Sequence, residues 1–251
     1  MTVLILGGTS EAAALAKACA RLGLGDVMVS LAGRTEAPAA LPLPVRVGGF
    51  GGAQGLADFL RAEGVAALVD ATHPFAARIS ANAAWAAACA GIPALALLRP
   101  GWSRQDGDRW IEVDDLAAAA AALGAAPRRV FLTIGRQGMG AFLAAPQHHY
   151  LARSIEPSGV ALPRLVELHA RGPFDADAEA ELMARERIDI VVTKHSGGRS
   201  TYGKIEAARR LGLDVVMVRR PARPDLPATG SVEEAVAFVA AHAGAAWKRG
   251  V

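Results

Sequence analysis

The fold is decided by one stretch near the start of the chain, Thr2-Val3-Leu4-Ile5-Leu6-Gly7-Gly8-Thr9-Ser10-Glu11. Its continuous apolar run predicts a strand buried on both faces, and the glycine pair before an alanine-rich segment predicts a tight turn into a helix. Glycines let the backbone approach a phosphate closely, while Thr9 or Ser10 caps the helix whose first N–H groups face the ligand. Thr9 and Ala12 stand where the dinucleotide fingerprint G-x-G-x-x-G has its second and third glycines, so a turn that binds nothing is the alternative.

The composition of the chain favours a cytoplasmic α/β protein that binds a small anionic ligand. At 251 residues, with 52% hydrophobic content and 27 glycines, the chain can bury a large core in one or two domains. The formal net charge of +3 is too small to indicate a nucleic-acid partner, and the apolar run at the N-terminus is too short for a signal peptide or a membrane span. Cys19 and Cys89 lie outside any C-x-x-C pattern, so both are expected to be buried in a reducing compartment. His148 and His149, expected at the surface, have no third ligand at metal spacing, so no metal site is predicted.

Strand and helix signals alternate over the first hundred residues, as in a doubly wound parallel sheet. The expected strands cover about 2–6, 27–31, 45–47, 66–69 and 92–98, and the expected helices cover 10–22, a segment that ends near 61, and 75–90. Arg34 follows the second strand, where an acidic residue would select a free ribose 2′-hydroxyl and an arginine accommodates a 2′-phosphate. Arg34 therefore predicts NADPH as the preferred dinucleotide, with a solvated loop arginine as the alternative.

The next candidate site residues follow the fourth expected strand, in Asp70-Ala71-Thr72-His73-Pro74-Phe75. Pro74 has no backbone N–H and suits a first helical turn, so Thr72 and His73 are expected at the carboxyl end of a central strand, where open α/β sheets bind ligands. We predict that Thr72 and His73 contact the cofactor, with Asp70 and Arg78 as further candidates. In the alternative interpretation, Asp70 only accepts hydrogen bonds within the turn and His73 is an ordinary loop residue.

The second half of the chain repeats the strand–glycine loop–helix pattern after a break. Residues 99–110 contain proline, glycine, tryptophan and a polar cluster, which is typical of a linker. Strands expected at 129–134, 188–193 and 215–218 precede a final helix that opens with a capping box at Ser231. We therefore predict an α/β fold of two Rossmann-like lobes, each a parallel sheet flanked by helices, with a cleft between them. Residues 1–103 are expected to form the nucleotide-binding domain, and residues 104–251 the domain that completes the cofactor and substrate cleft.

Cationic side chains accompany the glycine loops of the second lobe. Gly135-Arg136-Gln137-Gly138 follows one expected strand, and Lys194-His195-Ser196-Gly197 follows another. Arginine offers a fork, and lysine a point charge, to a phosphate or a carboxylate. We predict that all four residues of the first loop bind cofactor and that Lys194, Ser196, Gly197 and Lys204 bind substrate or phosphate, with both lysines at the rim of the site. Alternatively, Lys204 begins a solvated helix face with Glu206 and Arg209.

Taken together, the motifs resemble those of the precorrin-6A reductase family of cobalamin biosynthesis. The resemblance rests on Gly7-Gly8-Thr9-Ser10-Glu11, Asp70-Ala71-Thr72-His73-Pro74-Phe75-Ala76, Gly135-Arg136-Gln137-Gly138, and Lys194-His195-Ser196-Gly197 with Lys204. It covers nearly the whole chain in the right order, and the Asp-Ala-Thr-His-Pro-Phe run and the Lys-x-Ser-Gly loop are its most specific parts. It implies an NADPH-dependent oxidoreductase that delivers hydride to C19 and a proton to C18 of precorrin-6A, giving precorrin-6B. No proton donor follows from it, so no catalytic residue is assigned.

The implied substrate is a polycarboxylate tetrapyrrole, which Arg136, Lys194, Arg199 and Lys204 would complement in charge. Because the hydride chemistry belongs to the nicotinamide, positioning and exclusion of water are expected to dominate over acid–base work. Two other functions stay open. One is a different NADP-dependent enzyme of the short-chain type, although neither Tyr150 nor Tyr202 has a lysine four residues later. The other is a regulator that binds NADP without turnover.

Overall fold

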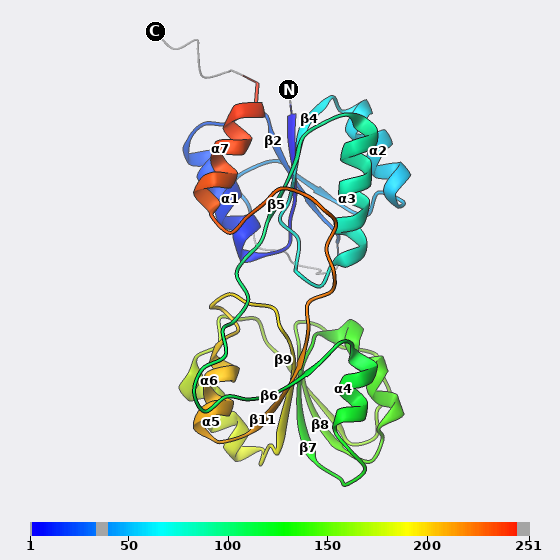
Figure 1. The fold of residues 1–251 in the computed structure, drawn as a ribbon, viewed down its shortest axis with the longest axis vertical. Coiled ribbons are helices and arrows are strands. Elements are labelled where there is room, and N and C mark those ends of the chain that lie inside the picture. Colours follow the sequence, from blue (N-terminus) through cyan, green and yellow to red (C-terminus); the bar gives the residue numbers. More distant parts are fainter. Residues whose placement is uncertain (1, 34–39, 245–251) are drawn as a thin grey trace. The chain divides into compact units, whose positions relative to one another are not determined.

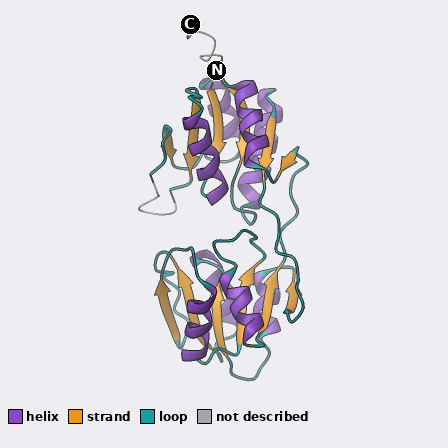
Figure 2. Ribbon diagram, turned by 90° about the vertical axis from the view of Figure 1, so that its left-hand side faces the viewer, coloured by secondary structure: helices purple, strands orange, loops and turns teal. Residues whose placement is uncertain are grey.

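The computed structural model of the protein describes residues 2–33 and 40–244. The chain divides into two compact units, one formed by Met1–Arg99 with Ala222–Val251 and the other by Pro100–Pro221. In the described residues each unit holds a six-stranded parallel sheet with helices on both faces (Figure 1, Figure 2). The predicted α/β fold with two helix-flanked parallel sheets is confirmed.

The first unit is built mainly from strands and helices that alternate along the chain. Its strands are β1 (Thr2–Leu6), β2 (Val27–Leu31), β3 (Val45–Val47), β4 (Val65–Asp70), β5 (Ala94–Leu97) and β12 (Ala228–Thr229), and its helices are α1 (Ser10–Arg21), α2 (Ala53–Ala62), α3 (Ala77–Ala90) and α7 (Val232–His242). Across the sheet the order is β12-β5-β4-β1-β2-β3. This is the doubly wound order, in which the chain reverses its direction of progress between β1 and β4 and leaves a ligand crevice at their carboxyl ends.

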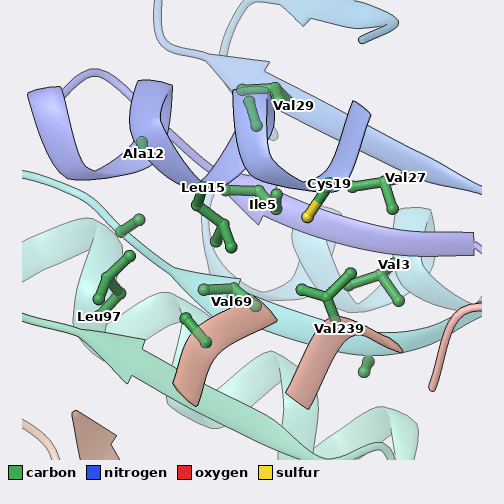
Figure 3. Close-up of a cluster of buried hydrophobic side chains, with 14 residues drawn as sticks. Val3, Ile5, Ala12, Leu15, Cys19, Val27, Val29, Val69, Leu97 and Val239 are labelled. Carbon is green, nitrogen blue, oxygen red and sulfur yellow. The ribbon is translucent and has the colours of Figure 1, made fainter. Parts of the chain in front are cut away.

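Strand β1 is buried on both faces, which explains why it is apolar throughout its centre. Because side chains alternate across a strand, Val3 and Ile5 face α1 and α7, while Leu4 and Leu6 face α2 and α3. Figure 3 shows the first of these two cores, in which Ile5 lies beside Leu15 of α1 and Val3 lies beside Val239 of α7. Cys19 lies in this core, and its burial raises the pKa of the thiol to about 11. Cys89 is exposed, so the prediction that both cysteines are buried is wrong for Cys89.

The second unit has the same strand order as the first. Its strands are β6 (Arg109–Val113), β7 (Arg129–Thr133), β8 (His149–Ser154), β9 (Leu165–His169), β10 (Ile190–Lys194) and β11 (Asp214–Val218), and its helices are α4 (Leu116–Ala122), the 3₁₀ helix η1 (Arg136–Ala144), α5 (Ala176–Arg185) and α6 (Gly203–Arg210). The order β9-β8-β7-β10-β11-β6 matches β3-β2-β1-β4-β5-β12 of the first unit position by position. The reversal of direction therefore falls between β7 and β10.

The sixth strand of the first sheet is where the structure differs from the predicted domain division. Strand β12, which fills this position in the first unit, follows the return of the chain at Ala222 and pairs with β5, where Leu98 N–H donates to the carbonyl oxygen of Thr229 at 2.8 Å. Helix α7 then buries Ala235 and Val239 in the core of the first unit. The predicted boundary assigned residues 104–251 to the second domain, whereas Ala222–Val251 belongs to the first unit. A strand as short as β12 has no periodic pattern that sequence reasoning could detect.

The segment predicted as a linker belongs largely to the fold of the second unit. Trp102 is 9% exposed, and its indole N–H donates to the carbonyl oxygen of Gly198 at 2.7 Å. Asp108 is buried and accepts a hydrogen bond from Arg209 at 2.8 Å. The polar residues suggested solvent exposure, because nothing near Asp108 in the sequence shows that its partner Arg209, about one hundred residues away, covers it.

The position of His148 also differs from the prediction. It was expected at the surface, but it is completely buried (0% exposed).

Candidate functional site

The loop after β1 is connected to the loop after β4 through the side chain of Thr9. Thr9 is the N-cap of α1: its Oγ1 accepts from Ala12 N–H at 3.1 Å and donates to the carbonyl oxygen of Ala71 at 2.8 Å. Gly8 is exposed with φ +112°, a conformation that side chains rarely adopt. Gly7 approaches β2 so closely that a Cβ on it would lie 2.9 Å from Cγ1 of Val29. The first N–H groups of α1 thus follow a glycine turn, which is the arrangement that binds anions.

The first two residues of α1 are Ser10 and Glu11, and Glu11 places a negative charge at the start of the helix. Ser10 Oγ donates to Oε2 of Glu11 at 3.0 Å, and the same carboxylate lies 3.6 Å from Nη1 of Arg99. Arg99 follows β5 and its side chain is 10% exposed. Arg99 was not among the predicted site residues, although its place just after a strand was a usable signal.

The loop after β4 is organised by the buried carboxylate of Asp70, which is 1% exposed. Its Oδ1 accepts from Thr72 N–H at 3.1 Å and from Thr72 Oγ1 at 2.6 Å. Its Oδ2 accepts from Nη2 of Arg223 at 3.1 Å. Asp70 therefore holds the backbone and hydroxyl of Thr72, as the alternative interpretation expected, and does so with an arginine that the sequence analysis did not identify.

His73 follows in the same loop and is half-buried. Its Nδ1 accepts from Phe75 N–H at 3.2 Å, so the neutral ring carries its proton on Nε2. Arg78 lies on α3 and is exposed. Thr72 and His73 are thus at the carboxyl end of β4, beside the Gly7–Glu11 loop to which Thr9 connects them.

In the second unit, the loop after β7 begins at Gly135 and turns directly into η1. Arg136 forms an ion pair with Glu156, with 2.6 Å between Nη1 and Oε2. Gln137 is exposed and Gly138 is buried. Arg136 is therefore a cation with a carboxylate partner already beside it.

The loop after β10 is held by the chain segment around Trp102 and by Arg220. His195 Nε2 lies 2.9 Å from the carbonyl oxygen of Trp102, and Arg220 Nη2 donates to the carbonyl oxygen of Ser196 at 3.0 Å. Gly197 has φ +70°, and a Cβ there would lie 2.1 Å from the carbonyl oxygen of Pro100. Only glycine fits this position, so the Lys-x-Ser-Gly pattern reflects packing as well as any ligand contact. Lys194 and Ser196 are half-buried.

Lys204 is not at a rim, which corrects the prediction made for it. The residue is 4% exposed, and its Nζ donates to the carbonyl oxygen of Thr201 at 2.7 Å and lies 5.2 Å from the centre of the Trp102 ring. The alternative of a solvated helix face is wrong for Lys204 as well. Arg199, on the same loop, is exposed.

The structure brings the predicted residues together in two groups, one at the direction reversal of each sheet. Gly7–Glu11 and Thr72–His73 follow the adjacent strands β1 and β4. Gly135–Gly138 follow β7, and Lys194 is the last residue of the adjacent strand β10, with His195–Gly197 directly after it. Arg34 lies outside the described residues. Among the described residues, no group of three His, Cys, Asp or Glu side chains is placed to hold a metal ion. In the same residues, every helix is too short or too polar to span a bilayer.

These two sheets, each with loops at its reversal point, define a doubly wound α/β protein. In this class of protein, ligands bind at the carboxyl ends of the strands. The model of the family described as precorrin-6x reductase CbiJ/CobK matches residues 2–240. The chain belongs to this family. It is 51% identical over 240 residues to the precorrin-6A reductase of Sinorhizobium sp, covering 95% of this chain and 92% of that protein.

Two further comparisons agree. A solved structure of CobK precorrin-6A reductase is 49% identical, has a TM-score of 0.91 and covers 100% of both chains. The cobalt-precorrin-6A reductase of Priestia megaterium is 31% identical over 232 residues, covering 87% of this chain and 90% of that protein.

Proposed function

We propose that this protein catalyses the NADPH-dependent reduction of precorrin-6A to precorrin-6B in cobalamin biosynthesis, with hydride delivered to C19. The observation that carries the proposal is the 49% identity with a TM-score of 0.91 over the whole of a solved precorrin-6A reductase. The two groups of loops at the sheet reversals support it because a reductase of this kind needs room for a dinucleotide and a second ligand.

The cofactor is proposed to bind at the loops of the first unit. Their fit to a phosphate rests on the exposed Gly8 at φ +112° and on the capped N-terminus of α1, where Thr9, Ser10 and Glu11 begin the helix. Thr72 and His73 border the same loop. NADPH supplies the hydride when it is bound, and these residues hold and orient it.

The substrate is proposed to bind through the cations of the second unit. Precorrin-6A carries several carboxylates, and two cations, Lys194 and Arg136, lie at the carboxyl ends of adjacent strands of that unit. Ser196 and Gly197 lie in a loop that Arg220 holds at the carbonyl oxygen of Ser196, and Lys204 donates to the carbonyl oxygen of Thr201 in the same loop. The neighbouring loop, after β7, contains Gly135, Gln137 and Gly138, which were predicted from the sequence as cofactor contacts.

The metal-free macrocycle is the proposed substrate. The chain is 51% identical to a relative named precorrin-6A reductase and 31% identical to one named cobalt-precorrin-6A reductase. The larger similarity favours precorrin-6A without cobalt.

The test is a direct assay with purified protein. NADPH and precorrin-6A are mixed with the enzyme, and oxidation of the nicotinamide is followed together with the mass of the tetrapyrrole product. We expect a product two hydrogens heavier, faster turnover with NADPH than with NADH, and slower turnover of the cobalt-containing macrocycle. Binding of NADPH without turnover of any tetrapyrrole would instead indicate a sensor, and turnover of a sugar nucleotide would indicate a short-chain-type enzyme.

A further inference from the structure

Arg223 pairs with a buried carboxylate at the proposed cofactor loop. It lies between the end of the second unit at Pro221 and β12, and it is 153 positions from Asp70 in the sequence. The Asp70 side chain is 1% exposed and the Arg223 side chain 21%. A buried carboxylate that loses its countercharge is strongly destabilised, so Arg223 is what permits a charged Asp70 at this position.

Asp70 uses its two oxygens for two different tasks. Oδ1 accepts both the backbone N–H of Thr72 at 3.1 Å and the Thr72 hydroxyl at 2.6 Å, whereas Oδ2 accepts Arg223 at 3.1 Å. The carbonyl oxygen of Ala71, between them, accepts the hydroxyl of Thr9. The loop is thus held from the β1 side by Thr9 and from the returning chain by Arg223, with Asp70 as the link.

We propose that Arg223 is a positioning residue for cofactor binding: through Asp70 it holds Thr72 and His73 in the arrangement that NADPH requires. This inference rests on the proposed function. A misplacement of about 1 Å can lower the rate of an enzyme by about 10²-fold. Binding is expected to weaken as well, because the displaced loop loses hydrogen bonds to a charged ligand, and a loss of about 10- to 100-fold in NADPH affinity is expected when the link is broken.

The experiment is a double-mutant cycle of Arg223→Gln, Asp70→Asn and the double variant, with Arg223→Lys as the conservative substitution. NADPH dissociation constants are measured at a temperature where unfolding curves show every variant to be folded. Each single variant should bind NADPH about 10- to 100-fold more weakly. The double variant should be no weaker than either single one, because both residues act through one pair, and Arg223→Lys should retain part of the affinity.

The second unit offers a matched control in Arg209 and Asp108. This ion pair is 2.8 Å long, with side chains 19% and 1% exposed, so its burial is nearly that of Arg223 and Asp70. Arg209→Gln should lower the free energy of unfolding by about as much as Arg223→Gln does, because each change breaks a buried ion pair. Its NADPH affinity should stay within about twofold of the wild type. The comparison separates positioning from stabilisation of the fold.

The outcomes decide between the possible roles of Arg223. A folded Arg223→Gln variant with wild-type NADPH affinity would overturn the inference. Additive losses in the double variant would overturn it too, because they would mean that Arg223 touches the cofactor itself. Hydrogen exchange of the Thr72 amide, measured without cofactor, should accelerate in Arg223→Gln and not in Arg209→Gln; equal exchange refutes the link even if NADPH proves not to be the cofactor. A wild type that binds no NADPH while the exchange rates differ as expected would leave the link in place and overturn the proposed function.

Discussion

Replacement of Thr9 by valine is expected to destabilise the first unit more than loss of a helix cap alone. Valine has the shape of threonine without the hydroxyl, so the change removes two hydrogen bonds: that from Ala12 N–H at 3.1 Å and that to the carbonyl oxygen of Ala71 at 2.8 Å. Loss of an N-cap costs about 0.5–2 kcal/mol. Ala71 is 0% exposed, and a buried acceptor left without a donor costs about 1–3 kcal/mol more. The free energy of unfolding should therefore fall by about 1.5–5 kcal/mol.

Urea unfolding, followed by circular dichroism, measures this difference, and two variants calibrate it. Thr9→Ser keeps a hydroxyl and should change the free energy of unfolding by less than about 1 kcal/mol. Ser231→Ala removes a cap that accepts from Glu234 N–H at 3.2 Å, together with an exposed hydrogen bond to Glu233 at 2.8 Å. Because neither leaves a buried group without a partner, the variant should cost about 1 kcal/mol. If Thr9→Val and Ser231→Ala lose the same stability, the hydrogen bond to Ala71 contributes nothing and the reasoning is refuted.

Three other predictions follow from the second unit. Gly197→Ala places a Cβ 2.1 Å from the carbonyl oxygen of Pro100, at a φ of +70°. Thermal unfolding should therefore show that the free energy of unfolding falls by about 3 kcal/mol or more. Gly140→Ala adds a Cβ in open space and should leave the stability nearly unchanged. Lys204→Met should lower the melting temperature, because the carbonyl oxygen of Thr201 loses its hydrogen-bond donor. Lys194→Ala should instead mainly weaken binding of the tetrapyrrole, by about 1.5–3 kcal/mol in a titration. Equal melting temperatures for both variants would count against the burial argument. Burial, and after it the charge of Arg128, lowers the pKa of His148 from its ordinary value of 6.5. The unfolded chain therefore binds this proton more readily than the folded protein. The free energy of unfolding should be highest above about pH 6.5 and should fall as the pH drops below that value. His148→Asn retains an acceptor for Arg128 N–H and should flatten this pH dependence in urea titrations; an unchanged slope would show that another group titrates.

The local patterns of the sequence were sufficient for the fold class and for the loops that follow the central strands. An apolar run such as Val3–Leu6 is typical of a strand buried between two layers of helices, and the glycine turn after it is typical of entry into a helix. The same reasoning placed Thr72 and His73 at a strand end. These features are determined by neighbouring residues, so a single sequence contains them.

Tertiary structure alone decided which distant residues complete the site. Asp70 has its cationic partner at Arg223 because the chain returns to the first unit to add β12, and no pattern near either residue indicates that return. Lys204 was predicted at a rim because it lies beyond a strand end and next to a glycine, but Trp102 from a segment that resembled a linker covers it. The physical reason is common to both cases. The burial and pairing of a charge depend on which segments the crossovers bring together, and that choice is made by packing of the whole unit rather than by the residues beside the charge.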